Sequence, residues 1–432
     1  MQRRGFPKAI VHFDGDSFFA SVEQSLNHTL RGKPVMTGSE RGIITSLSVE
    51  AKARGLRRGM SLREIRAICP EAFFIPSNYT AYSIYARRMY AIVRRFTPLV
   101  HEYSVDECFA DITGLDETAH VPYEEIALRI KRALEDRLGI TFGVGLAPNK
   151  LLAKIASKHR KPAGFTSIPL DEIPHFLAEL PIGKVWGIGS SMSVVLARLG
   201  VRTALDLREM TLDRLADSGL GKLYREMWYE LHGHCIHDIS EESDDAIGSI
   251  MKTRTFNPPS SSRGFIISQL SKNIEKACAT ARLHRVRARA ITFYLKTQEF
   301  TYHRIERALA LPSADPIEIL RAVLSRFNEL YVPGIRYRAT GITLRAIMAD
   351  EDIAEDLFGF SRQHDAIVPV LRSVDRVNHR YGRETIFLAS SMQALGHRDP
   401  RGKQSPGKSH EPVMDRDKRK KSINLPFLGT AR

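Results

Sequence analysis

The sequence predicts an α+β protein built from several domains, and three observations support this prediction. Its 432 residues are enough for about three domains at roughly 150 residues each. Short apolar, β-favouring segments alternate with longer segments whose apolar residues recur at helical spacing. The sequence shows no repeat of fixed period, which argues against a solenoid or a propeller.

The N-terminal part is expected to mix strands and helices. Residues 9–14 form an apolar run that leads into Gly15-Asp16-Ser17, so we expect a buried strand that ends in a turn. Residues 18–26 have helical spacing. Amphipathic helices are predicted for residues 80–98 and 123–138. Two short strands are predicted within residues 101–113, and one more at residues 141–147.

The pattern changes beyond residue 180. Short helical segments continue to about residue 233, and the acidic residues 241–245 are typical of a linker. Residues 247–347 show the element order β-α-β-β-α-β of a small ferredoxin-like sandwich. One amphipathic segment follows at residues 367–388, and the last ~35 residues have a composition typical of disorder.

Composition and charge exclude several classes of protein. Lys and Arg number 64 against 49 Asp and Glu, which gives a net charge of +15 and favours a polyanionic partner. No apolar run approaches the roughly 18 residues that a membrane span needs. The four cysteines are widely separated, as in reduced cytoplasmic proteins. Residues 232–237 contain three His and one Cys, but the spacing fits no zinc pattern, so we expect a solvated helix end there.

Three carboxylates stand at the ends of predicted strands. Asp14 closes the first strand, and Asp106 and Glu107 lie together between two others. Burying such groups is costly without a cation, and carboxylates are ligands that Mg²⁺ prefers. Two such ions stabilise the attacking and leaving oxygens of a phosphoryl transfer. Taken singly, Asp14 would be a helix cap and Asp106-Glu107 a solvated turn, but together in a basic protein they favour an enzyme of nucleic acids.

The segments around these carboxylates resemble the catalytic motifs of Y-family DNA polymerases, the translesion enzymes. Residues 13–23 (FDGDSFFASVE) and 103–107 (YSVDE) match two motifs, and residues 141–164 match a third. Order and spacing agree over residues 8–347. Three shorter segments favour the catalytic subunit of bacterial DNA polymerase V over DNA polymerase IV: residues 76–79, 185–189 and 376–383.

The resemblance implies a right-hand polymerase with a ferredoxin-like palm, small fingers, a helix-hairpin-helix thumb and a β-α-β-β-α-β little finger. A C-terminal linker would carry a motif like those that bind sliding clamps, followed by a basic tail. The implied boundaries are residues 1–30 and 80–175 for the palm, 31–79 for the fingers, 176–243 for the thumb, 247–347 for the little finger and 348–432 for the C-terminal part.

The resemblance also implies catalytic roles for individual residues. Asp14 and Asp106 would bridge two Mg²⁺ ions, Glu107 would bind the ion that activates the primer 3′-hydroxyl, and Gly15 would offer its carbonyl. Five residues are expected to contact the deoxynucleoside triphosphate, with Phe19 as the steric gate against a 2′-hydroxyl: Phe18, Phe19, Ser46, Lys52 and Lys161. Many members carry Arg where this chain has Lys52, and Lys lacks the bidentate fork of Arg.

Glycines and arginines are the candidate contacts to primed template DNA. Gly187 and Gly189 lie in a segment resembling a helix-hairpin-helix, where a backbone can approach a phosphate closely. Arg285, Arg287 and Arg289 flank the start of a predicted strand in the little finger and would make salt-sensitive phosphate contacts. A solvated face is the simpler explanation for any one of these arginines.

The C-terminal part suggests protein partners. Residues 354–358 end in Leu357-Phe358 and resemble the peptide with which bacterial polymerases bind the sliding clamp, although Ala354 stands where Gln is usual. The polymerase V branch implies a possible accessory subunit. The basic run at residues 418–421 fits a DNA contact and a solubilising tail equally well.

The sequence therefore favours a template-directed DNA polymerase of low fidelity that acts in translesion synthesis and DNA repair. It would work in the cytoplasm, at the nucleoid, without a membrane partner. One rival is a catalytically inactive DNA- and clamp-binding relative, which the three retained carboxylates argue against. The other is a two-metal nuclease, which the thumb and steric-gate motifs argue against. A proofreading exonuclease is not expected, since no further acidic constellation of that kind is evident outside the palm.

Overall fold

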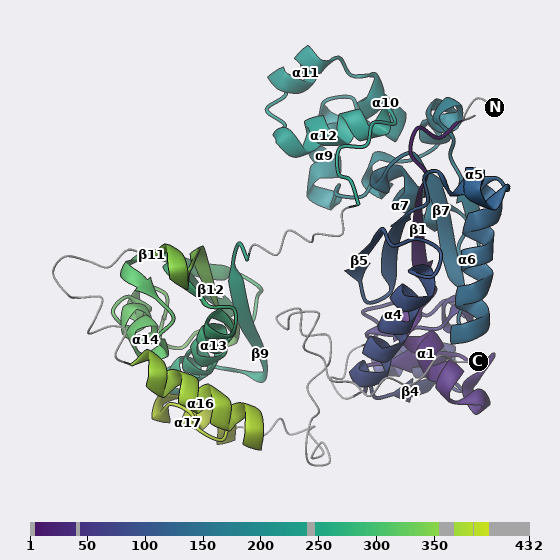
Figure 1. Ribbon diagram of the computed structural model, residues 1–432. Helices are drawn as coiled ribbons and strands as arrows, with labels where there is room; N and C mark the ends of the chain where they lie inside the picture. The colour runs from purple at the N-terminus through teal and green to yellow at the C-terminus, as the bar shows by residue number, and fades with distance from the viewer. Residues whose placement is uncertain (1–4, 40–43, 240–246, 354–366, 383, 397–432) are drawn as a thin grey trace. The chain divides into compact units, whose positions relative to one another are not determined.

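The computed structural model describes residues 5–39, 44–239, 247–353, 367–382 and 384–396 (Figure 1). The chain divides into two compact units between Ser243 and Asp244. Each unit has its own hydrophobic core. No helix among the described residues is both long and apolar enough to cross a membrane.

The centre of the first unit is a five-stranded sheet, the palm. The strand order is β5-β6-β1-β7-β8. All neighbours are antiparallel except β7 and β8. The strands are β1 (Ile10–Gly15), β5 (Val100–Ser104), β6 (Glu107–Asp111), β7 (Phe142–Ala147) and β8 (Phe165–Ser167). The central position of β1 explains why all six of its residues are buried.

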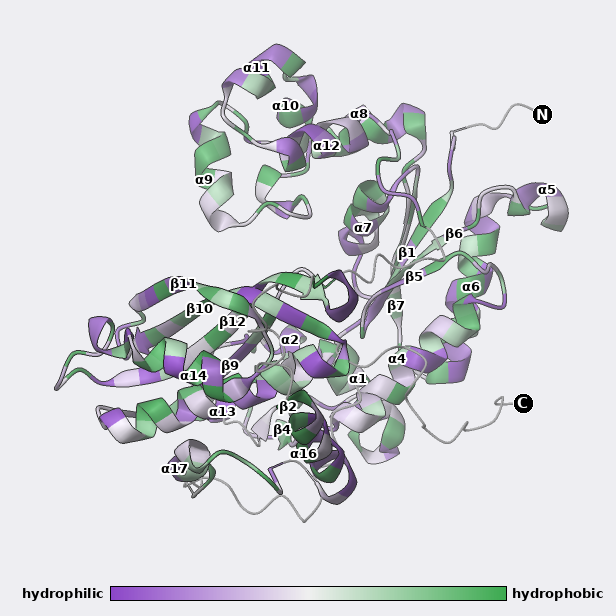
Figure 2. Ribbon diagram, turned by 60° about the vertical axis from the view of Figure 1, so that its left-hand side comes forward, coloured by the Kyte–Doolittle hydropathy of each residue, from purple (hydrophilic) through white to green (hydrophobic). Residues whose placement is uncertain are grey.

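Helices cover both faces of the palm sheet. On one face lie α4 (Tyr79–Val93) and α6 (Tyr123–Leu138), which share a core with Val11 and Phe13 of β1. The buried residues of α6 recur at helical spacing, and Figure 2 shows green segments alternating with purple ones along this helix. The other face is covered by α7 (Lys150–His159), whose residues 151–157 are all buried.

The fingers are a small subdomain with a core of their own. Strand β2 (Val35–Thr37) pairs with β3 (Ser46–Leu47) and β4 (Phe73–Ile75). Helix α1 (Phe18–Leu26) connects them to the palm. Two short helices complete the subdomain, α2 (Val49–Ala53) and α3 (Leu62–Ile68).

The thumb consists of short helices that share a core with α7. These helices are α8 (Ile173–Ala178), α9 (Ser190–Arg198), α10 (Ala204–Glu209), α11 (Leu212–Asp217) and α12 (Lys222–Leu231). Leu152 of α7 belongs to the same buried cluster as Leu196 and Leu207. The Asn149 side chain donates to the carbonyls of Glu230, at 2.7 Å, and His234, at 3.0 Å. The thumb is therefore anchored on the helix that covers the palm.

The second unit is the little finger. Its sheet has the order β11-β10-β12-β9, with every neighbouring pair antiparallel. The elements are β9 (Ile250–Ser260), α13 (Arg263–Leu283), β10 (Val286–Thr297), β11 (Tyr302–Ser313), α14 (Pro316–Leu324) and β12 (Tyr337–Ala349). The predicted order β-α-β-β-α-β is confirmed. The last strand, β12, lies between β9 and β10, and several of its buried residues belong to the same hydrophobic cluster as residues of helix α13.

A C-terminal helical segment packs on α13. It contains α16 (Val368–Tyr381) and α17 (Met392–Gly396). Arg282 of α13 donates two hydrogen bonds to Asp375 of α16, at 2.7 and 2.8 Å. The amphipathic segment predicted at residues 367–388 thus contains a helix, which ends at Tyr381.

Candidate active site

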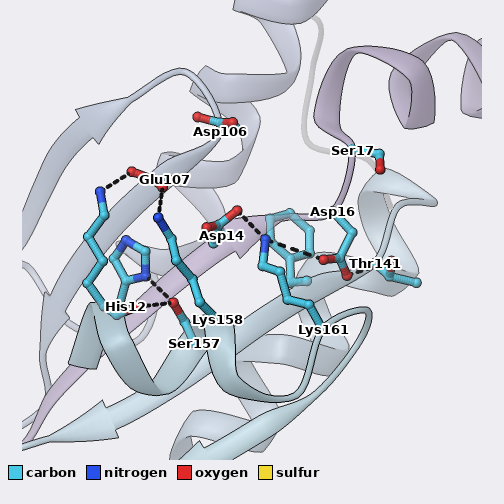
Figure 3. Close-up of polar contacts among 12 residues, drawn as sticks. His12, Asp14, Asp16, Ser17, Asp106, Glu107, Thr141, Ser157, Lys158 and Lys161 are labelled. Atoms are coloured by element: carbon cyan, nitrogen blue, oxygen red, sulfur yellow. Dashed lines mark hydrogen bonds and ion pairs between the residues drawn. The ribbon is translucent and has the colours of Figure 1, made fainter. Parts of the chain in front are cut away.

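The three predicted carboxylates lie at one end of neighbouring palm strands (Figure 3). Asp14 on β1 stands directly opposite Glu107 on β6. The backbone N–H of Gly15 donates to the carbonyl of Asp106 at 2.8 Å, which fixes the turn before β6 against the end of β1. Sequence positions almost a hundred residues apart are thereby held together by strand pairing.

Asp14 is buried in this site. Its side chain is 8 % exposed, and one carboxylate oxygen accepts a hydrogen bond from Lys161 Nζ at 2.5 Å. Burial raises the pKa of Asp14 to about 6, because the charged form loses solvation, and Glu107 and Asp106 add to the rise. Lys161 acts in the opposite direction without cancelling the effect. A group of this kind is stabilised as a carboxylate by any further cation that reaches it.

Asp16 also contributes to the site, although the sequence interpretation gave it no role. It accepts hydrogen bonds from Thr141 Oγ1 at 3.0 Å and from the backbone N–H of Ala163 at 2.7 Å. Lys161 Nζ lies 3.4 Å from it. Asp16 thus ties the segment after α7 to the turn after β1 and places Lys161 between two carboxylates.

Two further lysines on α7, which sequence reasoning missed, face Glu107. Lys154 Nζ donates to Glu107 Oε2 at 2.6 Å, and Lys158 Nζ lies 3.9 Å from Oε1. The signal in the sequence was the spacing of four residues, which puts both lysines on one helical face. The sequence alone did not show which strand that face would meet.

The residues fit a divalent cation, although the described side chains do not gather around a metal position. Among the described residues, no three His, Cys, Asp or Glu side chains form a group that could hold an ion. Lysines instead neutralise Asp14 and Glu107. The backbones of the three carboxylates are locked by strand pairing, and hard oxygen donors of this kind suit Mg²⁺.

The predicted nucleotide contacts divide between the site and the core. Lys52 Nζ donates to Ser17 Oγ at 2.7 Å, and Ser46 Oγ donates to the Ser17 carbonyl at 3.2 Å. Burial lowers the pKa of Lys52, and the nearby Lys161 and Arg58 lower it further. Cations crowded in this way are suited to an anionic ligand such as a triphosphate.

Phe18 and Phe19 occupy different environments. Phe19 is half-buried and stacks on Tyr82, with ring centroids 4.3 Å apart and planes 11° apart. Phe18 is only 3 % exposed and packs beneath Gly15, where an added Cβ would come within 2.8 Å of its ring. The Phe18 side chain therefore belongs to the core, and its expected contact with the nucleotide stays a prediction. Phe19 remains partly exposed, and its role as the steric gate stays a prediction.

The residues predicted to contact DNA differ in their exposure and in their partners. Gly187 has φ +97°, a conformation that favours glycine, and Gly189 caps α9 with open space around it. Arg285 and Arg289 are exposed, but Arg287 pairs with Asp350 at 3.0 Å. Leu357 and Phe358 lie outside the described residues.

The histidine-rich segment after α12 shows the expected helix end. Helix α12 stops at Leu231, and the His232 ring hydrogen-bonds to the carbonyl of Trp228 at 2.8 Å. The Cys235 thiol donates to the Asp238 carboxylate at 3.2 Å and to the backbone carbonyl of His237 at 3.8 Å, and not to an imidazole ring. This segment lies among the described residues, which contain no candidate metal group.

Three family models match the chain. The impB/mucB/samB family matches residues 13–158, the IMS family HHH motif residues 171–201, and the C-terminal domain of the impB/mucB/samB family residues 248–357. The first match contains the three carboxylates, and the second contains the glycines of the thumb.

Curated relatives extend over nearly the whole chain. DNA polymerase IV of Desulfatibacillum aliphaticivorans is 33% identical over 391 residues, covering 88% of this chain and 96% of the relative. DNA polymerase IV of Moorella thermoacetica is 32% identical over 397 residues, covering 90% and 97%. These relatives bear the name polymerase IV, so the closer likeness to polymerase V stays a prediction.

Solved structures support the same fold. A Y-family DNA polymerase chimera aligns with a TM-score of 0.63 at 24% identity, covering 79% of this chain and 99% of the chimera. The insertion ternary complex of Dbh DNA polymerase aligns with a TM-score of 0.52 over the same shares. With the palm, fingers, helical thumb and little finger described above, the chain therefore belongs to the Y family of DNA-directed DNA polymerases.

Proposed function

We propose that this protein extends primers across damaged template DNA by two-metal nucleotidyl transfer, with low fidelity and without a proofreading exonuclease. The observation that carries the proposal is the meeting of Asp14, Asp106 and Glu107 at the ends of β1 and β6, surrounded by lysines. The reaction joins the primer 3′-oxygen to the α-phosphorus of a deoxynucleoside triphosphate and releases pyrophosphate.

The carboxylates would hold two Mg²⁺ ions, which stabilise the attacking and leaving oxygens of such a transfer. Asp14 and Asp106 are the proposed shared ligands, Glu107 the ligand on the primer side, and Gly15 the source of a backbone carbonyl. The burial of both carboxylates beside lysine ammonium groups supports these roles, because it shows that cations occupy positions next to Asp14 and Glu107.

Basic side chains on the fingers side would hold the triphosphate. Lys161 is 30 % exposed and can leave its carboxylate partners when a more highly charged anion arrives. Lys52 and Ser46 gather around Ser17 at the start of α1. Phe19, stacked on Tyr82, would lie beneath the sugar and exclude a 2′-hydroxyl.

The little finger and thumb would grip the duplex, and other partners would act through the C-terminal part. Exposed Arg285 and Arg289 are suited to phosphate contacts that carry no sequence information. We propose that Leu357 and Phe358 bind the sliding clamp. An accessory subunit and an association with the nucleoid in the cytoplasm are consistent with this role.

Primer extension on undamaged and lesion-bearing templates tests the proposal. The parent protein should extend both with Mg²⁺ and leave a mismatched 3′ terminus undigested. Asp106→Ala should abolish nucleotide addition and leave duplex affinity almost unchanged, since that affinity comes mainly from basic contacts. Asp136→Ala, on the exposed side of α6, is the matched control and should behave like the parent. Normal extension by Asp106→Ala would contradict the site assignment.

A further inference from the structure

Lys154 is the most deeply buried cation of the site. Its side chain is 5 % exposed, and its Nζ lies 2.6 Å from Glu107 Oε2. The same Nζ lies 4.1 Å from the centre of the Tyr103 ring and 4.7 Å from that of Trp186. A buried ammonium needs compensation for lost solvation, and here a carboxylate and two aromatic faces provide it.

The two rings connect the catalytic strands to the thumb. Tyr103 lies on β5 of the palm, and Trp186 lies in the segment that leads into α9 of the thumb. Their rings meet edge to face at 5.3 Å, and Phe109 of β6 stacks on Trp186 at 5.9 Å. Lys154 therefore contacts both subdomains as well as a proposed metal ligand.

The backbone of α7 is fixed at this position. Ser157 Oγ donates to the Lys154 carbonyl at 2.9 Å and lies 2.7 Å from His12 Nδ1 on β1. His12 is fully buried beside Phe109, with ring centroids 4.4 Å apart. Lys154 thus extends from a rigid part of the helix, and its ammonium has little freedom to move to solvent.

Lys154 differs from Lys161 in this respect. Lys161 is 30 % exposed and can swing toward a triphosphate, whereas Lys154 is enclosed. If a divalent ion takes Glu107, Lys154 must remain in place and stay charged on the two rings. Its contacts with Tyr103 and Trp186 allow this.

We propose that Lys154 is a positioning residue. In the metal-free site its ammonium group is the ion-pair partner of Glu107. When Mg²⁺ binds Glu107, this ion pair is replaced by the bond to Mg²⁺, and the ammonium group stays against the Tyr103 and Trp186 rings. This inference rests on the proposed function, in which Glu107 is a metal ligand. Two consequences follow. The first is that the buried carboxylate of Glu107 always has a cation beside it, either Lys154 or Mg²⁺. The second is that the surroundings of the Trp186 ring in the thumb change when the ion binds.

Thermal unfolding of the full chain with EDTA or with Mg²⁺ tests the first consequence. Lys154→Met keeps the bulk of the side chain but leaves Glu107 unpaired. In EDTA its Tm should fall by on the order of 10 °C, as expected when one partner of a buried pair is removed. Mg²⁺ should restore most of this loss, and so should the second change Glu107→Gln in EDTA. Lys154→Arg, which keeps the charge, should lose much less.

Two outcomes would overturn the inference. One is a Lys154→Met protein with no loss of Tm in EDTA. The other is a loss that neither Mg²⁺ nor Glu107→Gln reduces, because Lys154 would then serve packing alone. Failure of the proposed function would look different: the parent protein itself would extend no primer with Mg²⁺.

A spectroscopic measurement keeps the inference testable even if Lys154→Met does not fold. The chain has two tryptophans, so Trp228→Phe leaves Trp186 as the only reporter. Adding Mg²⁺ at concentrations that saturate primer extension should change Trp186 emission, whereas matched ionic strength from KCl should not. An unchanged emission under conditions of full Mg²⁺-dependent activity would refute the coupling.

Discussion

Gly145→Ala should disrupt the active site by displacing helix α7 from strand β7. A Cβ built at Gly145 on β7 would lie 2.1 Å from the Ala153 carbonyl oxygen, 2.4 Å from the Ser157 nitrogen and 2.7 Å from the Ala156 Cβ. Two of these are backbone atoms of α7, so no side-chain rotation relieves the clash. The helix must move away from the strand, or the strand must bend.

The magnitude follows from the cost of overpacking. Forcing an extra methyl into a packed core costs about 1–3 kcal/mol, and a backbone clash this close belongs at the upper end. For a unit of this size that corresponds to a Tm lower by roughly 5–10 °C. Primer extension should also fall, because Lys154, Lys158 and the following Lys161 are carried by α7 and its end.

Tryptophan fluorescence during thermal unfolding is the appropriate assay, since Trp186 and Trp228 both lie in the first unit. Gly221→Ala is the matched control, because Gly221 has φ −73° and nothing within 4 Å of an added Cβ. It should unfold at nearly the parental Tm. A Gly145→Ala protein with parental Tm and activity would refute the close approach of α7 to β7.

Three other predictions concern substrate choice, a partner and pH. Phe19→Ala should admit ribonucleotides, because it removes the ring, stacked on Tyr82, that is proposed to exclude a 2′-hydroxyl. Unchanged exclusion of rNTPs would place the gate elsewhere. The double change Leu357→Ala, Phe358→Ala should leave basal extension intact and remove stimulation by the loaded sliding clamp on primed circular DNA, since each buried side chain is worth about 1.5–3 kcal/mol; full stimulation would make this segment a linker only. Burial raises the pKa of Glu230 to about 7 from 4.5, so this group makes the fold less stable as pH rises from 4.5 to 7. Glu230→Gln should therefore stabilise the first unit at pH 8, by up to about 3 kcal/mol, and have little effect near pH 4.5; equal unfolding free energies at pH 8 would contradict this.

The sequence alone determined the family, several helices and the order of elements in the little finger. Helices at residues 18–26 and 123–138 begin and end where their apolar spacing predicts, because helical periodicity is a local property of the chain. The three carboxylates are found together at the strand ends, as expected from their positions after apolar β-favouring runs. The order of elements in the little finger was legible for the same reason.

Only the tertiary structure decided which groups meet across the fold. It placed Lys154 between Glu107 and the Trp186 ring, buried Phe18 beneath Gly15, and engaged Arg287 with Asp350. These contacts depend on strand order and on how closely a helix approaches a sheet, and residues far apart in sequence determine both. Hydrophobic periodicity says which face of a segment turns inward, but the partner of that face is selected by packing of the whole core.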